Sequence, residues 1–157
     1  MVWIICRQFK GEQVMYEYKA KIIRVVDGDS IIVDIDLGFN VMLYKQSVRL
    51  YGVDTPETRT KNPLEKKCGL LAKEYVQSLL KANQIYTIKT HLDKKGKFGR
   101  ILADFRINIV FLSELLITKG YAVKYTGQSK ELVRAAHIAN QQRLINEGLI
   151  TIDGWLL

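Results

Sequence analysis

The strongest constraint on the fold is a hairpin pattern in the first third of the chain. Apolar and β-branched residues dominate Tyr18–Val26 and Ser30–Leu37, and Asp27-Gly28 lies between these two segments. An Asp-Gly pair between two β-rich segments is the strongest short-range signal for a β-hairpin. The turn accounts for Asp27 and Gly28, but Asp29 follows it on the outgoing strand and needs another explanation.

The pattern continues into a meander. A third strand is expected over Val41–Gly52 after a turn at Gly38, because β-branched and apolar residues dominate it. Val53–Thr60 is expected to be a loop, since Pro56 cannot donate to a sheet. Two further strands are expected over Ile85–His91 and Ile101–Ile107.

A helix is expected between the third and fourth strands. Asn62 as N-cap, Pro63 at N1 and Glu65 at N3 form a helix start, and the helix should run to about Ala82. Apolar residues recur along it at steps of four and three, so that one face should cover a core. The residues of this stripe are Leu64, Cys68, Leu71, Tyr75 and Leu79.

Two more helices are expected over Val110–Lys119 and Ser129–Glu147, each followed by a helix-ending glycine. Five short strands with one helix inserted and others after the fifth strand indicate an α+β protein, a five-stranded OB-fold β-barrel with about three helices. Residues 1–15 show no periodicity and are expected to be an N-terminal extension to a single domain over residues 16–157. Met1 and Met15 are both candidate starts.

Charge points to a polyanionic partner. The formal net charge is +8, and residues 59–100 hold eleven Lys/Arg against three acidic residues. A basic face kept for solubility is the alternative. The two cysteines, Cys6 and Cys68, indicate neither a disulfide framework nor a zinc site. No export signal or membrane span is recognised, so the compartment is left open with the cytoplasm as the default, and a phage or plasmid origin is one hypothesis. A monomer without a membrane partner is also expected.

Several charged residues do not fit their local structure. Pairing of strands two and three would bring Asp29 to the barrel end where residues 52–57 lie. Carboxylates that converge repel one another and favour a cation, and oxygen ligands without histidine or thiol suit Ca²⁺ or Mg²⁺. Guanidinium groups bind phosphate with two parallel hydrogen bonds, so acids, cation and arginines together would form a phosphodiester-hydrolysing site. The residues are Asp29, Arg49, Asp54, Glu57 and Arg100.

Each of these residues has a simpler interpretation when taken alone. Asp29 could be a turn acid, Arg49 an edge-strand residue that blocks pairing, and Glu57 a solvated loop residue. His91 and His137 are isolated from other ligand types and are interpreted as structural or surface residues.

Three segments together resemble the staphylococcal nuclease (thermonuclease) family: VVDGDSIIV, VRLYGVDTPE and KFGR, in that order. The resemblance extends from about Tyr18 to Trp155. It implies an OB barrel and a calcium-dependent nuclease, with one Ca²⁺ ion and Mg²⁺ as the second choice. Such an enzyme hydrolyses phosphodiester bonds of DNA and RNA with little sequence preference and leaves 3′-phosphate ends. Single strands should be preferred, because an open barrel face reaches them more easily.

The resemblance also assigns roles by motif position. It implies that Asp29, Asp54 and the Thr55 carbonyl bind the metal, and that Asp27 supports them without binding it directly. Glu57 would position the attacking water or act as general base. The phosphate-binding arginines would be Arg49 and Arg100, and less closely matched substrate contacts would be Lys97, Phe98, Tyr121 and Tyr125. At Phe98 the family has a tyrosine, so a hydroxyl available to a nucleotide phosphate is lost.

Two other functions remain as alternatives. A non-catalytic OB-fold module that only binds nucleic acid is the main one, and a protein-interaction adaptor using the basic helix face is the other. Retention of all the acids and arginines favours the enzyme. Digestion of heat-denatured DNA in calcium and then in chelator separates the enzyme from the binding module.

Overall fold

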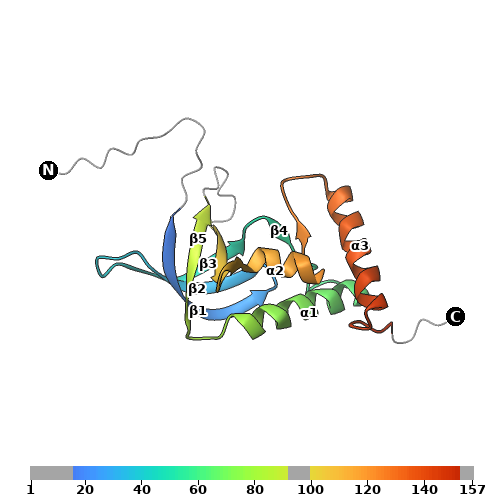
Figure 1. Ribbon diagram of the computed structural model, residues 1–157, viewed down its shortest axis with the longest axis horizontal. Helices are drawn as coiled ribbons and strands as arrows, with labels where there is room; N and C mark the ends of the chain where they lie inside the picture. Colours follow the sequence, from blue (N-terminus) through green and yellow to red (C-terminus); the bar gives the residue numbers. More distant parts are fainter. Residues whose placement is uncertain (1–15, 92–99, 153–157) are drawn as a thin grey trace.

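The computed structural model describes residues 16–91 and 100–152, with three helices beside a strongly curved sheet (Figure 1). The expected N-terminal extension, residues 1–15, lies outside the described residues. So do residues 92–99, which include the expected substrate contacts Lys97 and Phe98, and residues 153–157.

A closed barrel forms the body of the protein. Its strands follow the order β3-β2-β1-β5-β6, and all these neighbours pair antiparallel. A parallel pairing of β3 with β6, in which Arg49 is opposite Leu102, closes the sheet. This arrangement confirms the expected α+β, OB-type barrel. The strands are β1 Glu17–Asp27, β2 Ser30–Asp36, β3 Met42–Leu50, β5 Ile85–His91 and β6 Ile101–Ile107.

The barrel interior is filled by inward-facing side chains of the strands. On β2, the alternate residues Ile31, Val33 and Ile35 are all buried, as the period of two in a strand requires. Phe105 of β6 is the largest fully buried side chain. Burial of one such side chain stabilises the fold by about 1.5–3 kcal/mol, so the barrel carries much of the hydrophobic stabilisation.

Helix α1 spans Pro63–Leu79 and begins as the sequence predicts. The Asn62 side chain accepts hydrogen bonds from the backbone N–H groups of Leu64 (3.0 Å) and Glu65 (3.2 Å). The helix ends before the expected Ala82. The Tyr86 hydroxyl donates a hydrogen bond to the Leu79 carbonyl (2.9 Å), which satisfies a carbonyl of the last turn. The same hydroxyl accepts a hydrogen bond from the backbone N–H of Lys81.

The buried face of α1 is made of smaller residues than the sequence predicts. Four residues are buried, and they are Cys68, Gly69, Ala72 and Val76. Of the expected stripe, Cys68 is buried, whereas the other four members are only partly buried and flank it. Small side chains at the centre allow the helix to approach the backbone of the loop after β4 closely, as described below.

Helix α2 spans Leu112–Lys119 and begins two residues later than expected. Val110 and Phe111 instead form strand β7 (Val110–Phe111), which pairs with the end of β6. The helix ends at Gly120, whose φ of 76° is the left-handed conformation that glycine adopts at helix ends. Helix α3 spans Lys130–Asn146 with Ser129 as N-cap, close to the expected bounds.

One expectation about the backbone is wrong. Val53 and Asp54 were expected in a loop, but they form strand β4 (Val53–Asp54), which pairs antiparallel with β8 (Val123–Lys124). Pro56 does not prevent this pairing, because it lies beyond the two paired residues. The backbone N–H of Tyr125 extends the pairing by donating to the Gly52 carbonyl (2.8 Å). The chain that leads into α3 is thereby fixed beside the DTPE segment.

Among the helices of the described part, none is long and apolar enough to cross a bilayer.

Candidate active site

Asp29 lies at the inner end of the site and is 6% exposed. Its position follows from the register of β2 with β3, in which Ser30 is opposite Arg49. The Asp29 Oδ2 atom accepts a hydrogen bond from the backbone N–H of Thr55 (3.1 Å) and forms an ion pair with the Arg49 guanidinium. The expected pairing of strands two and three therefore brings these segments together, and Asp29 does more than close a turn.

Arg49 connects the two acids that the sequence singles out. One of its terminal nitrogens pairs with Asp29, and the other lies 2.9 Å from Asp54 Oδ1. Burial by itself acts to lower the pKa of Arg49, but the two carboxylates outweigh this effect and raise it. The guanidinium therefore stays charged and offsets one of the two negative charges while it bridges both carboxylates.

Asp54 has a second partner that the sequence did not reveal. Its Oδ2 atom lies 2.8 Å from Nε2 of His137 on α3. Burial acts to raise the pKa of Asp54, but the hydrogen bonds with His137 and Arg49 outweigh it and lower the pKa. Asp54 is therefore a stable carboxylate with both oxygens engaged.

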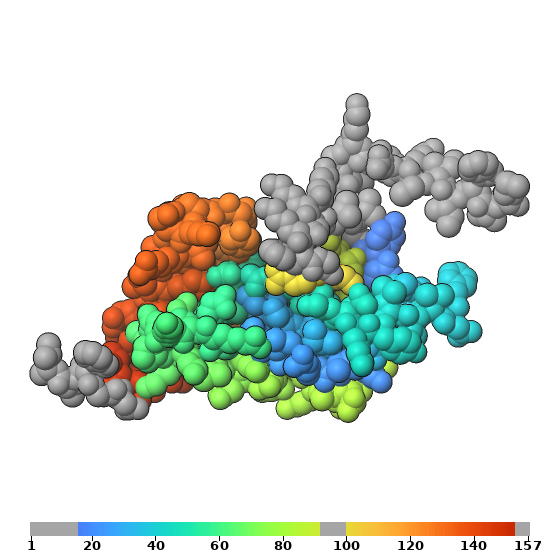
Figure 2. Space-filling model, turned by 180° about the vertical axis from the view of Figure 1, so that it is seen from behind, coloured from blue at the N-terminus to red at the C-terminus, as the bar shows by residue number. Residues whose placement is uncertain are grey.

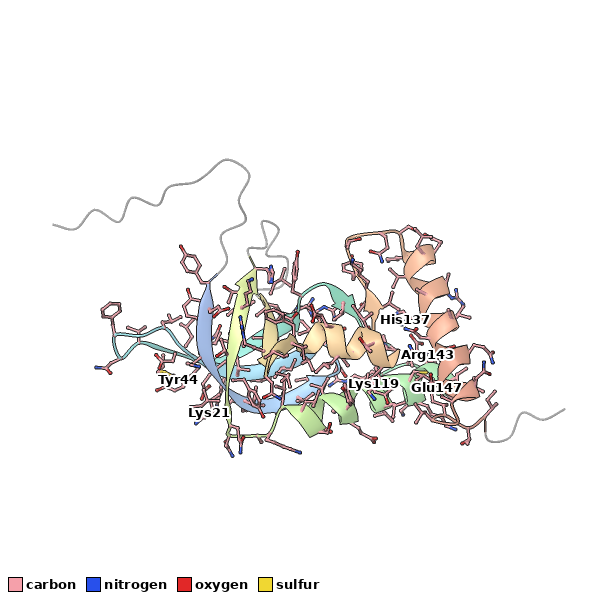
Figure 3. The ribbon with its side chains drawn as sticks, in the orientation of Figure 1. Lys21, Tyr44, Lys119, His137, Arg143 and Glu147 are labelled. Atoms are coloured by element: carbon pink, nitrogen blue, oxygen red, sulfur yellow. The ribbon has the colours of Figure 1, made fainter. Side chains whose placement is uncertain are left out.

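The sequence predicts a structural or surface role for His137 and does not predict this contact with Asp54. Figure 3 shows His137 on α3, away from the end of the helix that carries Arg143 and Glu147. A signal was present in the sequence, because Lys130, Arg134, His137 and Gln141 recur at steps of four and three and share one polar helix face. Such a face is also typical of a solvated helix, so spacing alone did not single out the histidine.

Glu57 is exposed and lies near the same acids. Its pKa is raised, first by partial burial and then by the charges of Asp29, Asp27 and Asp54. Since like charges perturb it, Glu57 belongs to the same electrostatic cluster without sharing a hydrogen bond with it. Asp27 accepts a hydrogen bond from the Thr58 hydroxyl, which ties the first turn to the loop that carries Glu57.

Helix α1 holds that loop from the other side. A Cβ atom at Gly69 would lie 2.7 Å from the Pro56 carbonyl oxygen and 2.8 Å from that of Glu57. No real Cβ atom packs so closely, so the loop can occupy its position only because residue 69 is glycine. Thr55, 5% exposed, is buried at the start of the same loop.

Arg49 and Asp54 line a groove of about 1620 Å³ between the barrel and α3, and Asp29 is connected to it through its ion pair with Arg49. Figure 2 shows the orange part of the chain, which precedes and begins α3, rising as a lobe at one end of the molecule. Arg100 and Tyr125 line this groove together with Arg49. Tyr121 does not line it. The Tyr121 ring is 9% exposed and packs edge-on against Tyr75 at 5.1 Å, so it presents no open face to a substrate.

The donor atoms match a hard cation in kind. Among the described residues, no group of three or more His, Cys, Asp or Glu side chains has the arrangement of a metal site. Two carboxylates do share one guanidinium, and buried Thr55 lies beside them. Carboxylate and carbonyl oxygens are the ligands that Ca²⁺ and Mg²⁺ prefer, with water or phosphate completing the shell. The residues therefore match such an ion by the chemistry of their donor atoms.

Fold and site together define an OB-barrel protein with an acid–arginine network at the edge of a basic groove. The family model described as staphylococcal nuclease homologue matches residues 47–146. A thermonuclease of Staphylococcus hyicus is 35% identical over 106 residues, which are 68% of this chain and 59% of that protein. A thermonuclease of Staphylococcus intermedius is 39% identical over 80 residues, 51% of this chain and 44% of that protein.

A third relative, an uncharacterized protein of Bacillus anthracis, is 31% identical over 117 residues, 74% of this chain and 50% of that protein. The chain belongs to the staphylococcal nuclease family, which confirms the resemblance found in the three sequence segments. It spans about half the length of these relatives.

Proposed function

We propose that the chain is a calcium-dependent nuclease that hydrolyses phosphodiester bonds of DNA and RNA, prefers single strands and leaves 3′-phosphate ends. The observation that carries the proposal is the connected network of Asp29, Arg49 and Asp54 at the edge of a basic groove. Membership in the staphylococcal nuclease family supports the chemistry. Phosphoryl chemistry needs positive charge at the phosphate and a positioned water. Arg49 can supply the first, and Glu57, which lies near the network, can supply the second.

The proposal assigns a role to each residue of the site. Asp29, Asp54 and the Thr55 carbonyl would hold the cation, which when bound neutralises phosphate charge and lowers the pKa of a bound water. Arg49 and Arg100 would bind phosphate oxygens, and a guanidinium can do so with two parallel hydrogen bonds. Glu57 would accept a proton from the attacking water, a task for which a raised carboxylate pKa is suited.

The decisive experiment measures cleavage of a fluorogenic single-stranded DNA in Ca²⁺, in Mg²⁺ and in chelator. Activity should require Ca²⁺ and should be lost in Asp29→Asn and Asp54→Asn, because each substitution removes a charged oxygen ligand. Glu74→Gln, an exposed acid of α1, is the matched control and should keep the wild-type rate. Cleavage by Asp54→Asn at the wild-type rate would refute the metal assignment. Binding without cleavage under all conditions would favour the non-catalytic module.

Glu57→Gln separates the water-positioning role from metal binding. A general base contributes on the order of 10²- to 10⁴-fold, so the rate should fall within that range while calcium affinity stays unchanged. Calcium affinity is measured by isothermal titration, independently of turnover. A loss of calcium affinity as large as that of Asp54→Asn would make Glu57 a ligand instead. Extension of the products by terminal transferase only after phosphatase treatment tests the position of the cut, because a 3′-phosphate blocks extension.

A further inference from the structure

Helix α3 is not packed like a core helix. Over its 17 residues only Leu144 is buried, and Lys130–His137 contain no buried residue. The second half is anchored by the Asn140 amide, which donates to the Ala122 carbonyl (3.2 Å), and by Arg143, which donates to the Thr118 carbonyl (3.0 Å). Burial of an apolar stripe therefore does not explain the position of the first half of α3.

The first half of α3 instead forms a wall of the groove. The residues of this helix that line the groove lie on one helical face, and they are Lys130, Val133, Arg134, His137, Ile138 and Gln141. The contact of His137 with Asp54 links this face to the acid–arginine network. On the barrel side, the groove is lined by Arg49, Arg100 and Tyr51.

The charges of the groove exceed what one scissile phosphate needs. Three further cations line the groove besides the two arginines of the proposed site. They are Lys124 of β8 and Lys130 and Arg134 of α3, and we call these three residues the α3 wall. Lys124 is paired with Val53, next to Asp54, so the wall begins at the site. The carboxylates that line the groove are Asp54, already paired with Arg49, and Glu65. The α3 wall therefore carries excess positive charge.

Size and aromatic residues indicate what the wall would bind. The volume of about 1620 Å³ exceeds the roughly 300–1,000 Å³ typical of small-molecule pockets. Tyr51 and Tyr125, 36% and 44% exposed, line the same groove. Cations alternating with exposed rings are how proteins hold single-stranded nucleic acid, because phosphates pair with the cations and bases stack on the rings.

We propose that the α3 wall binds the phosphates of a single-stranded polynucleotide beyond the one that is cut. This inference rests on the proposed function and names its substrate as a polymer of several nucleotides. Lys124, Lys130 and Arg134 are then determinants of substrate length, and α3 keeps its place to present two of them.

The test compares a Lys130→Gln/Arg134→Gln variant with wild type on fluorescein-labelled oligothymidylates of two and twelve nucleotides. Glutamine, lysine and arginine have similar helix propensities, so α3 should stay intact. The control is Lys21→Gln/Lys119→Gln, which removes the same charge from exposed positions outside the groove (Figure 3). Binding is measured by fluorescence anisotropy in chelator at several salt concentrations, so that cleavage does not interfere.

The twelve-nucleotide strand should bind the wall variant about tenfold more weakly, and its salt dependence should fall by about 1.4 log units per decade, roughly 0.7 for each lost phosphate contact. The affinity of the wall variant for the dinucleotide should fall by less than about twofold, since the dinucleotide does not reach the wall and distant charge is screened. The control should match wild type on both strands. In calcium, kcat/KM should show the same length dependence.

The proposal would be overturned if the wall variant lost affinity equally for both strand lengths or if the control variant lost as much affinity as the wall variant. An unchanged dependence of affinity on salt concentration would also overturn it. Vesicles of phosphatidylglycerol and phosphatidylcholine provide a further arm. If the wall variant loses vesicle binding and keeps oligonucleotide binding, the wall serves a membrane and the proposal is wrong. Length-dependent binding without calcium-dependent cleavage would refute the nuclease function and leave the wall as a strand-binding surface, so the two failures are distinguishable.

Discussion

Gly69 on α1 gives a direct test of how the fold positions Glu57. An alanine Cβ there would lie 2.7 and 2.8 Å from the carbonyl oxygens of Pro56 and Glu57, and 2.9 Å from the Glu57 carbonyl carbon. These atoms belong to the backbone, so no side-chain rotation relieves the contact. Gly69→Ala must therefore push the loop away from α1 by about half an ångström or more to reach ordinary contact.

Two opposing effects determine the stability of Gly69→Ala. Overpacking costs about 1–3 kcal/mol, while replacing glycine inside a helix returns about 1 kcal/mol. The free energy of unfolding should therefore fall by about 0–2 kcal/mol, a decrease in Tm of at most several degrees for a domain of this size. Turnover should respond more strongly. A 1 Å misplacement of a reacting group costs about 10²-fold, so half that displacement of Glu57 should cost about tenfold.

The assay is a double-mutant cycle on cleavage rate at saturating calcium. If the loss acts through Glu57, Gly69→Ala should slow the wild type about tenfold and the Glu57→Gln variant much less, because coupled residues are not additive. Leu70→Ala, at the next and exposed position of α1, is the control and should change neither rate. The reasoning would be refuted if Gly69→Ala kept the wild-type cleavage rate. It would also be refuted if Gly69→Ala slowed the Glu57→Gln variant as much as it slows the wild type.

Three further predictions follow from individual groups. Arg49→Lys keeps the charge but loses the planar fork, so steady-state turnover should fall roughly 10²-fold, and a rate near wild type would show that Arg49 supplies charge alone. Burial raises the pKa of Asp104 above 3.8 despite the hydrogen bonds from Ser113, so folding favours its protonated form. In urea titrations the free energy of unfolding of wild type should fall, relative to Asp104→Asn, as pH rises from about 3 to 7, and a constant difference would contradict this. Burial also raises the pKa of the Cys68 thiol to about 11. In a Cys6→Ser background Cys68 should react with iodoacetamide near pH 8 only after unfolding, and native-state labelling at the rate of free cysteine would oppose it.

Much of the fold could be predicted because local patterns and tertiary structure agree in it. The Asp27-Gly28 turn, the alternation on β2 and the Asn62 cap each follow from residues within a few positions of one another. The pairing of β4 with β8 could not be predicted in this way. It joins two-residue strands separated by about 70 positions, too short to leave a periodic signal.

The site was partly predictable for a similar reason. Asp29, Arg49 and Asp54 lie in motifs, and the pairing of β2 with β3 is enough to bring the first two together. His137 depends on where α3 docks, which is set by contacts such as Asn140 with Ala122 and leaves no spacing rule in the sequence. Tyr121 is a different case: family position suggests a substrate contact, whereas its ring packs against Tyr75 and the residue is 9% exposed.

The ion pairs of Arg49 bear on how the proposed site would work as a whole. A guanidinium has five N–H donors, and in this arrangement both terminal nitrogens are directed to Asp29 and Asp54. A cation held by those carboxylates would weaken their attraction for Arg49 and leave its donors available to a phosphate. Under the proposed function, cation and phosphate therefore strengthen each other's binding, and this coupling is reciprocal by thermodynamic necessity. Two acids that share one arginine thus form a network with a net negative charge, which attracts a cation, and under the proposed function it binds phosphate once that cation is present.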